Sequence, residues 1–218
     1  ERGSGQFVDV SWDDAIKEVV ARLDALANAG DQKSLAFLTR QRRGGRADLI
    51  AQTMQGLGAA APIVHEVFSD EVLRRANAIS FGSRQLPTFD LEHTRYLLVF
   101  GADFLGTWNS AVAHGAAYGR MRQRSGGMRA KFVYVDSRLT QTGANADEFI
   151  ACRPGTEGLL AAVIAGEVGQ LRQTGAPADG DAAAMIAATG VPAETVTRIG
   201  REFAGNAPAV AMVGGTAL

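Results

Sequence analysis

The chain has 218 residues, of which 46% are hydrophobic, and a formal net charge of −1 at pH 7. This length allows one large core or two small ones, and the charge gives no reason to expect nucleic acid or an anionic membrane as a partner. The single cysteine, Cys152, excludes a disulfide framework and any metal or iron–sulfur site built only from cysteines of these residues. No apolar run approaches the roughly 20 residues of a membrane-spanning helix, so we expect no direct membrane insertion by this segment.

The first part of the chain begins with a short extended arm, residues 7–10, and a helix that Ser11 caps. Asp13 and Asp14 suit the first turn of that helix, because carboxylates are favourable at a helix N-terminus. Apolar residues at helical spacing give it one apolar face, and Gly30 ends it. A buried strand, a helix and a second extended run are then predicted at residues 34–38, 47–57 and 63–67.

The middle of the chain repeats one arrangement three times: an apolar run stops at a Gly, an Asp or a Pro-Gly turn, and a helix-like segment follows. Unbroken apolar runs of this length are typical of parallel strands buried on both faces, which bind ligands at their carboxyl ends. The three strands are predicted at residues 96–101, 131–136 and 148–153. We therefore expect any chemistry to gather after them, at residues 101–109, 136–142 and 154–158.

The predicted helices of this part lie at residues 70–78, 111–124, 159–171 and 193–203. The final strand, residues 209–213, has no partner nearby in sequence, so we expect it to pair beside the strand at 34–38. The whole is then an α/β fold of two Rossmann-like lobes with mostly parallel sheets and flanking helices. The first lobe is discontinuous and incomplete, residues 1–67 plus 208–218, and the second, residues 68–207, has the form of a nucleotide cradle.

Five stretches, which follow one another in order along nearly the whole chain, carry a family resemblance. They are residues 2–16, 96–123, 131–149, 153–158 and 196–215. Together they resemble the catalytic subunit of the molybdopterin oxidoreductase family, most of all the branch that contains polysulfide and thiosulfate reductases and the molybdopterin-like subunit of alternative complex III. A strand that ends in Gly before a helix is weak evidence alone, but five stretches in register are much stronger.

The resemblance implies that the full-length parent is a molybdopterin-dependent oxidoreductase acting on a small inorganic or sulfur substrate. Its implied cofactors are molybdopterin guanine dinucleotide with molybdenum, and a 4Fe-4S cluster whose cysteines lie before Glu1, outside this fragment. The chain starts without a methionine and stops just after a strand-like run, which favours a piece of a longer polypeptide. The family places a second pterin-binding domain after Leu218, so we expect the fragment alone to contain no molybdenum and to be inactive.

The implied partners are an iron–sulfur electron-transfer subunit and a membrane-anchor subunit, and the implied location is the bacterial periplasm or a membrane reached through those partners. Some members of the resembled branch keep the fold and have lost the cofactor. A cofactor-free scaffold subunit of a membrane respiratory complex is therefore an open alternative. An ordinary Rossmann-type dinucleotide protein is disfavoured, because the chain has no GxGxxG motif.

The resemblance and the chemistry of the strand ends together predict a set of cofactor-binding residues. They are Gly101, Ala102, Asp103, Asp136, Arg138, Gly155, Thr156 and Glu157. Asp103 stands where many family members have Asn, and Glu157 stands where Asp is frequent. A carboxylate close to a diphosphate is electrostatically unfavourable, so the Asp103 position departs from what nucleotide binding favours.

Several of these positions also have a plainer structural interpretation. Gly101 lets amide groups of residues 102–109 meet a phosphate, or it simply forms a tight turn. Asp136 can accept two hydrogen bonds from ribose hydroxyls or from guanine, or it can cap a turn. Arg138 can pair with a phosphate or remain a solvated surface group, and Thr156 can cap the next helix.

Ser69 is a candidate metal ligand. In the resembled family the protein ligand to molybdenum begins a segment that runs through a short helix into a glycine, and Ser69 holds that place relative to Gly82. A serine oxygen can coordinate a high-valent metal that deprotonates it. The alternative is that Ser69 caps the helix starting at Asp70.

Overall fold

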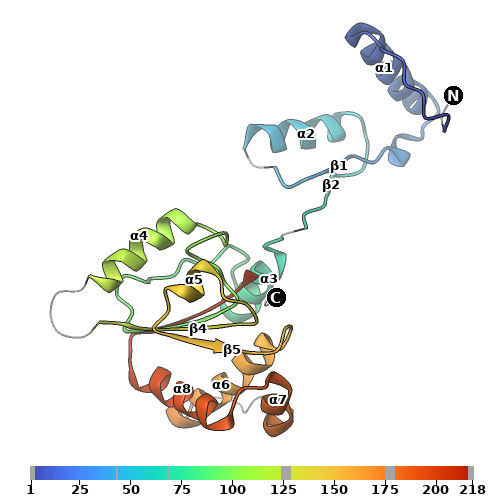
Figure 1. Cartoon of the computed structure of the whole chain (residues 1–218). Helices are drawn as coiled ribbons and strands as arrows, with labels where there is room; N and C mark the ends of the chain where they lie inside the picture. The colour runs from blue at the N-terminus through green and yellow to red at the C-terminus, as the bar shows by residue number, and fades with distance from the viewer. Residues whose placement is uncertain (1–2, 43, 68, 124–128, 175–179, 216–218) are drawn as a thin grey trace. The chain divides into compact units, whose positions relative to one another are not determined.

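The computed structural model describes residues 3–42, 44–67, 69–123, 129–174 and 180–215 (Figure 1). The chain forms two compact units, Glu1–Ser69 and Asp70–Leu218, which we call unit 1 and unit 2. Within the described ranges, none of the helices has the length and apolar character needed to cross a bilayer.

Unit 1 contains two α-helices and a minimal sheet. Helix α1 begins where predicted, because the Ser11 hydroxyl oxygen accepts a 3.2 Å hydrogen bond from the Asp14 amide. Strands β1 and β2 pair in parallel, with Leu38 opposite Ile63. The elements are α1 (Trp12–Asn28), the 3₁₀ turn η1 (Gln32–Ser34), β1 (Leu38–Thr39), α2 (Gly45–Gly56) and β2 (Ile63–Val64).

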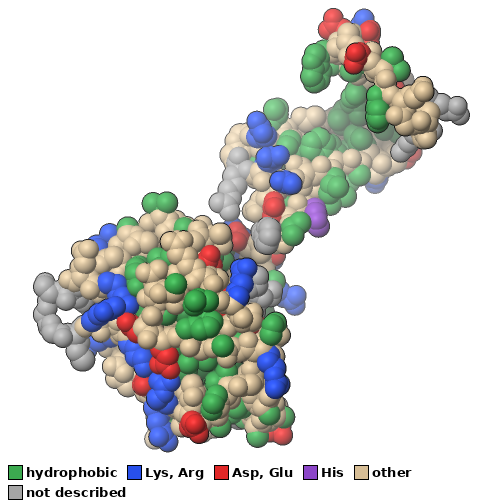
Figure 2. Space-filling view, in the orientation of Figure 1, with side chains coloured by type: hydrophobic (Ala, Val, Ile, Leu, Met, Phe, Trp, Pro, Cys, Tyr) green, Lys and Arg blue, Asp and Glu red, His purple; other side chains and the backbone are tan. Residues whose placement is uncertain are grey.

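Most large apolar side chains of unit 1 are exposed. Trp12, at the start of α1, is 84% exposed, and hydrophobic side chains lie on the surface over this helix (Figure 2). Met54 alone among the large hydrophobic residues described in this unit is buried. The predicted buried strand at residues 34–38 is wrong, since the strand begins at Leu38, which is 68% exposed. A sheet of two strands with two residues each is too small to bury its side chains.

Unit 2 contains one parallel sheet covered on both faces. Strands β3 and β4 are buried along almost their whole length, as predicted for parallel strands. The elements are α3 (Glu71–Phe81), β3 (Tyr96–Phe100), α4 (Ala111–Arg122), β4 (Lys131–Asp136), α5 (Gln141–Ala144), β5 (Glu148–Ala151), α6 (Glu157–Arg172), α7 (Ala182–Thr189), α8 (Ala193–Gly205) and β6 (Ala209–Val213).

The sheet has the strand order β5-β4-β3-β6, and every neighbouring pair is parallel. Helices α4 and α5 lie on one face and α6, α7 and α8 on the other (Figure 1). Successive strand residues point to opposite faces and therefore supply two cores. Leu98 and Val133 pack with Ile199 of α8, whereas Leu97 and Phe132 pack on the α4 side. The predicted α/β class with parallel sheets and flanking helices is confirmed.

The last strand pairs differently from our expectation. Strand β6 lies beside β3, with Phe100 opposite Val213, so the predicted pairing with residues 34–38 is wrong and this strand belongs to unit 2. Burial explains the choice, because Met212 becomes fully buried in the core on the α4 side. The short, exposed strand β1 offers no comparable burial.

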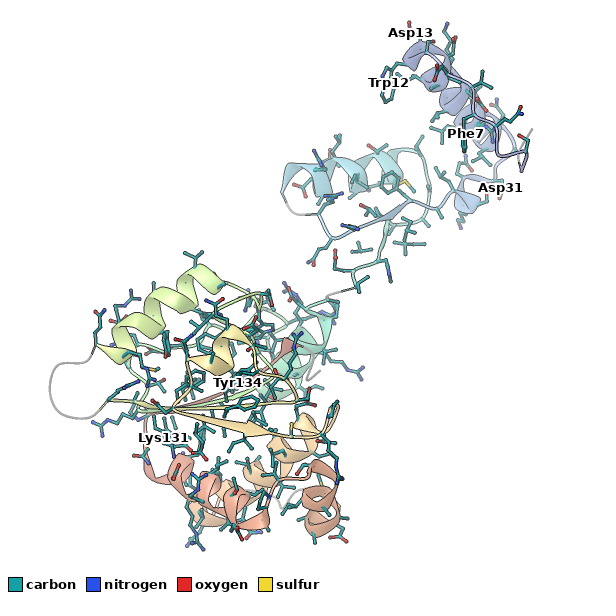
Figure 3. The ribbon with its side chains drawn as sticks, in the orientation of Figure 1. Phe7, Trp12, Asp13, Asp31, Lys131 and Tyr134 are labelled. Atoms are coloured by element: carbon teal, nitrogen blue, oxygen red, sulfur yellow. The ribbon has the colours of Figure 1, made fainter. Side chains whose placement is uncertain are left out.

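Charged side chains form a cluster where the strands begin, at the edge that Figure 3 marks with Lys131. Lys131 Nζ lies 2.6 Å from Glu202 Oε2 and 3.1 Å from Glu148 Oε2. Arg198 of α8 bonds to both carboxylates, and the Tyr96 hydroxyl donates to Glu202 at 2.8 Å. This amino-edge cluster fastens α8 to the first residues of β3, β4 and β5.

Candidate functional site

The carboxyl ends of the unit 2 strands meet at the opposite edge of the sheet. After β3 the chain crosses to β4 and β5 on one side, and it returns through α6, α7 and α8 to place β6 on the other side of β3. The strand order therefore reverses between β3 and β6, and parallel sheets bind ligands at such a switch point. The three predicted turns, residues 101–109, 136–142 and 154–158, all follow strands at this edge.

The backbone segments that follow β3 and β6 approach each other closely at the switch point. Gly101 and Gly215 have φ angles of 64° and 65°, and a Cβ on Gly215 would lie 2.4 Å from the Gly101 carbonyl oxygen. A Cβ on Gly214 would lie 2.4 Å from the Trp108 ring. Glycine is therefore required at both positions after β6. The sequence prediction missed them, although a Gly-Gly pair directly after a strand is a readable signal.

Asp103 connects the loop after β3 to helix α5. Its Oδ1 accepts hydrogen bonds from the Thr142 hydroxyl at 2.6 Å and the Thr142 amide at 3.3 Å. Its Oδ2 accepts from the Thr107 hydroxyl at 3.2 Å and the Thr107 amide at 3.3 Å. Partial burial raises the pKa of Asp103, but the hydrogen bonds together lower the pKa by a larger amount. The net shift is downward, so the carboxylate is charged at neutral pH.

The amides of residues 104–108 donate hydrogen bonds within the protein. Their acceptors are the carbonyl oxygens of Ala102 and Asp103 and the hydroxyl of Thr142. Ala102 itself is fully buried. The amides of residues 104–108 are therefore not available for the phosphate contact expected at residues 102–109. The amides that can still bind a phosphate are the others of this range and those in the first turn of α4, where helix geometry leaves amides without an intrahelical acceptor.

Asp136, the last residue of β4, is fully buried and its carboxylate accepts hydrogen bonds from the protein. Oδ2 accepts from the Tyr134 hydroxyl at 2.8 Å, and the Thr140 hydroxyl donates to Tyr134 at 3.2 Å. Oδ1 accepts from the Arg138 amide at 3.2 Å, which is the geometry of a turn cap. Figure 3 places Tyr134 between β4 and α5. The Arg138 side chain is exposed, so its guanidinium is accessible to an anion.

The turn between β5 and α6 is held by the end of α7. The Arg153 amide donates to the Thr189 carbonyl at 2.9 Å, and its guanidinium donates to two carbonyl oxygens in the last turn of α7 at 3.2 Å. Gly155 has a φ angle of 78°. The Thr156 hydroxyl donates to the Arg153 carbonyl at 2.6 Å, so Thr156 occupies the N-cap position without a side-chain capping bond to α6.

Glu157 begins α6 and is buried with one oxygen unsatisfied. The residue is 3% exposed, and Oε2 has no hydrogen-bond partner among the residues that the structure describes. Burial and the nearby Glu157 charge raise the pKa of the Cys152 thiol to about 11, so the thiol remains protonated. A buried acceptor without a donor costs about 1–3 kcal/mol. A ligand or a water that donates a hydrogen bond would recover that cost.

Trp108 and His114 belong to an aromatic cluster under the loop after β3. Their rings stack with centroids 5.9 Å apart, and Phe104 and Phe89 meet His114 edge-on at 6.1 and 6.3 Å. His114 is 7% exposed, its Nδ1 has no partner within the described ranges, and burial lowers its pKa. A neutral imidazole therefore packs on Trp108, whose ring also lies against Gly214.

Ser69 is the last residue of unit 1, whereas the predicted cofactor-binding residues all lie in unit 2. Helix α3 begins at Glu71 with Asp70 at the N-cap, so Ser69 does not occupy the capping position. In the part of the chain that the structure describes, no three His, Cys, Asp or Glu side chains are grouped to hold a metal. The metal-ligand role of Ser69 stays a prediction.

The chain is similar to subunits of several reductases. It is 26% identical over 238 residues, or 98% of this chain, to the menaquinone reductase, molybdopterin-binding-like subunit, of Nitratidesulfovibrio vulgaris. It is 28% identical over 73% of this chain to the arsenate respiratory reductase molybdopterin-containing subunit ArrA of Shewanella sp.. It is 27% identical over 75% of this chain to the thiosulfate reductase molybdopterin-containing subunit PhsA of Salmonella typhimurium.

The chain spans 34%, 18% and 20% of the lengths of these three relatives. Acetylene hydratase from Pelobacter acetylenicus has the same fold, with a TM-score of 0.70 and 17% identity over 97% of this chain and 30% of that chain. The family model for molybdopterin oxidoreductase matches residues 1–171. The chain therefore belongs to the molybdopterin oxidoreductase family, as the sequence resemblance predicted.

Proposed function

We propose that unit 2 holds the dinucleotide tail of molybdopterin guanine dinucleotide in a longer oxidoreductase that converts a small inorganic or sulfur substrate. Membership of the family supports a molybdenum–pterin cofactor in the parent protein. The switch point between β3 and β6 supports a nucleotide at the carboxyl edge. When the cofactor is bound, its molybdenum supplies the redox chemistry, and the residues of unit 2 bind and orient the nucleotide.

The observation that carries this proposal is the unpartnered oxygen of Glu157. A buried carboxylate oxygen at this edge requires a hydrogen-bond donor. The Watson–Crick edge of guanine presents two adjacent donors, the N1–H and the 2-amino group, whereas adenine presents one donor, the 6-amino group, beside an acceptor at N1 that a carboxylate oxygen would repel. Glu157 therefore fits guanine better than adenine, and we assign it to the base.

The other predicted residues divide into those that face a ligand and those that support them. The exposed Arg138 side chain and the amides of residues 157–159, in the first turn of α6, suit phosphate groups. Gly101 allows the backbone to pass close to a ligand. Asp136 lies beneath the surface, where it fixes the turn that carries Arg138.

The proposal is tested by binding of guanosine diphosphate (GDP) to the 218-residue chain. The chain has two tryptophans, so a Trp12→Phe variant leaves Trp108 as the single fluorescent reporter. Trp108 lies against Gly214 at the switch point, so its emission should respond to a ligand there. We expect GDP to bind with a Kd on the order of 100 µM and ADP to bind at least about tenfold more weakly.

Glu157→Gln should lower GDP affinity about tenfold and remove the preference over ADP, because one charge-assisted acceptor is replaced by a neutral amide. Glu167→Gln, on the same helix and distant in sequence from its first turn, should keep both properties. A chain that binds no GDP contradicts the proposed function. Equal GDP binding by the wild-type chain and Glu157→Gln contradicts the assignment of Glu157.

The partners that follow from this proposal are an iron–sulfur electron-transfer subunit and a membrane-anchor subunit, with the protein held at a membrane through them.

We also propose Ser69 as the protein ligand to molybdenum in the whole protein. Ser69→Ala should then alter the molybdenum coordination seen by X-ray absorption spectroscopy. Unchanged coordination would exclude this role.

A second candidate is a cofactor-free scaffold subunit of a membrane respiratory complex. It is favoured by the relative that matches 98% of the chain, whose name describes a molybdopterin-binding-like subunit. Both oxygens of Asp136 also already accept hydrogen bonds from the protein. Metal and pterin analysis of the whole protein separates the candidates, since stoichiometric pterin supports the oxidoreductase and its absence supports the scaffold.

A further inference from the structure

Asp103 accepts an unusually large number of hydrogen bonds from protein groups. Its two carboxylate oxygens accept four of them, from the hydroxyls and amides of Thr107 and Thr142. Its carbonyl oxygen also accepts from the amides of residues 106–108. Asp103 therefore fixes the conformation of the loop after β3 by hydrogen bonds from both its side chain and its backbone.

The same contacts join two separate loops of the carboxyl edge. Thr142 is fully buried in α5, and its hydroxyl also accepts a 3.0 Å hydrogen bond from the Leu105 amide. The loop is closely packed, because a Cβ on Gly106 would lie 2.3 Å from Asp103 Oδ2. The loop after β3 and the helix after β4 are thus held together by one carboxylate and one hydroxyl.

We propose that Asp103 is a positioning residue, which fixes residues 101–108 and their connection to α5 so that the first turn of α4, which follows this loop, can receive the phosphate groups of a nucleotide. This role rests on the proposed function of the carboxyl edge. Asp103 does not contact the ligand, because both its oxygens are turned toward protein donors. Its negative charge is correspondingly offset by the hydroxyl and amide dipoles that surround it.

The direction in which Asp103→Asn changes the affinity for a diphosphate distinguishes this positioning role from a direct electrostatic effect on the ligand. If Asp103 faced a phosphate, Asp103→Asn would remove a repulsive charge and tighten binding of a diphosphate. If Asp103 positions the loop, Asp103→Asn replaces an acceptor oxygen by an amide that cannot accept from Thr107 or Thr142, and binding weakens.

The experiment compares the wild-type chain with Asp103→Asn and Thr142→Val, both of which break the connection from opposite sides. Asp181→Asn is the control, because it removes the same charge at the N-cap of α7, where Asn caps equally well. Hydrogen exchange measures the loop, and the affinities for GDP and guanosine measure binding. Guanosine has the base and ribose of GDP but no phosphate.

We expect both loop variants to speed exchange of the Leu105 and Thr107 amides and to weaken GDP binding about tenfold. Guanosine affinity should change less than about twofold, because the base contact at Glu157 is retained. Unchanged exchange, or GDP binding that is unchanged or tighter in Asp103→Asn, overturns the proposal. If the wild-type chain binds no GDP, the proposed function and the phosphate role fail together, and the exchange rates alone decide whether Asp103 fixes the loop.

Discussion

The two edges of the unit 2 sheet differ in how their charged groups are paired. At the amino edge, Lys131 lies between Glu148 and Glu202, and Arg198 bonds to the same two carboxylates. At the carboxyl edge, Glu157 keeps a buried oxygen without a described partner. Because a buried polar atom without a hydrogen-bond partner is costly, we interpret the fully paired cluster as structural and the unpartnered Glu157 oxygen as part of the proposed ligand site.

The largest effect should come from the backbone packing of the carboxyl edge. Gly214→Val would push a branched side chain into Trp108, because even a Cβ would lie 2.4 Å from the ring. We expect the free energy of unfolding to fall by about 3 kcal/mol, measured by urea denaturation. A loss below about 0.5 kcal/mol would show that the loop after β6 moves freely and that the switch point is not closely packed.

Glu202→Gln tests the amino edge. It removes a charge that pairs with Lys131 and Arg198 and accepts from the Tyr96 hydroxyl. The side chains are partly exposed, so after allowance for solvent screening we expect a loss of about 2 kcal/mol in unfolding free energy. GDP affinity should stay unchanged. A variant that loses GDP binding while remaining folded would break the separation between the two edges.

The pH dependence of stability should follow the same cluster. Burial raises the pKa values of Glu148 and Glu202, but hydrogen bonds from Arg198 and Lys131 lower these values by a larger amount, so the net shifts are downward. Folded-state pKa values below the unfolded value of 4.5 give stability that is complete above pH 4.5 and is lost as pH falls through the folded values. Urea unfolding at pH 7 and pH 3.5 should therefore show a smaller pH effect, by about 1 kcal/mol, in Glu202→Gln than in wild type. Equal pH effects would contradict a stabilising role for the cluster.

Local patterns predicted the strands and turns of unit 2 well. The apolar runs that became β3 and β4 were readable because parallel strands buried on both faces are continuously apolar. Helix α7 was missed, since its Ala-rich sequence has no amphipathic pattern. Its ends were nevertheless signalled by Asp181, whose carboxylate accepts from the Ala183 and Ala184 amides, and by Gly190 with a φ of 75°.

The wrong and missing parts of the prediction depend on non-local contacts. The partner of β6 could not be read from residues 209–213, because strand pairing is decided by which core buries the side chains. The direction of the Asp103 carboxylate, toward Thr142, depends on a residue 39 positions away. The unsatisfied oxygen of Glu157 likewise becomes visible only when its surroundings are known.

Hydrogen exchange of the 218-residue chain with and without GDP tests the contrast between the two edges most directly. We expect GDP to slow amide exchange after β4 and at the N-terminus of α6, residues 137–142 and 155–160, and to leave exchange at the amino-edge residues 94–96 and 198–202 unchanged. Protection confined to the amino edge, or no protection at a GDP concentration well above about 100 µM, would contradict a nucleotide site at the carboxyl edge.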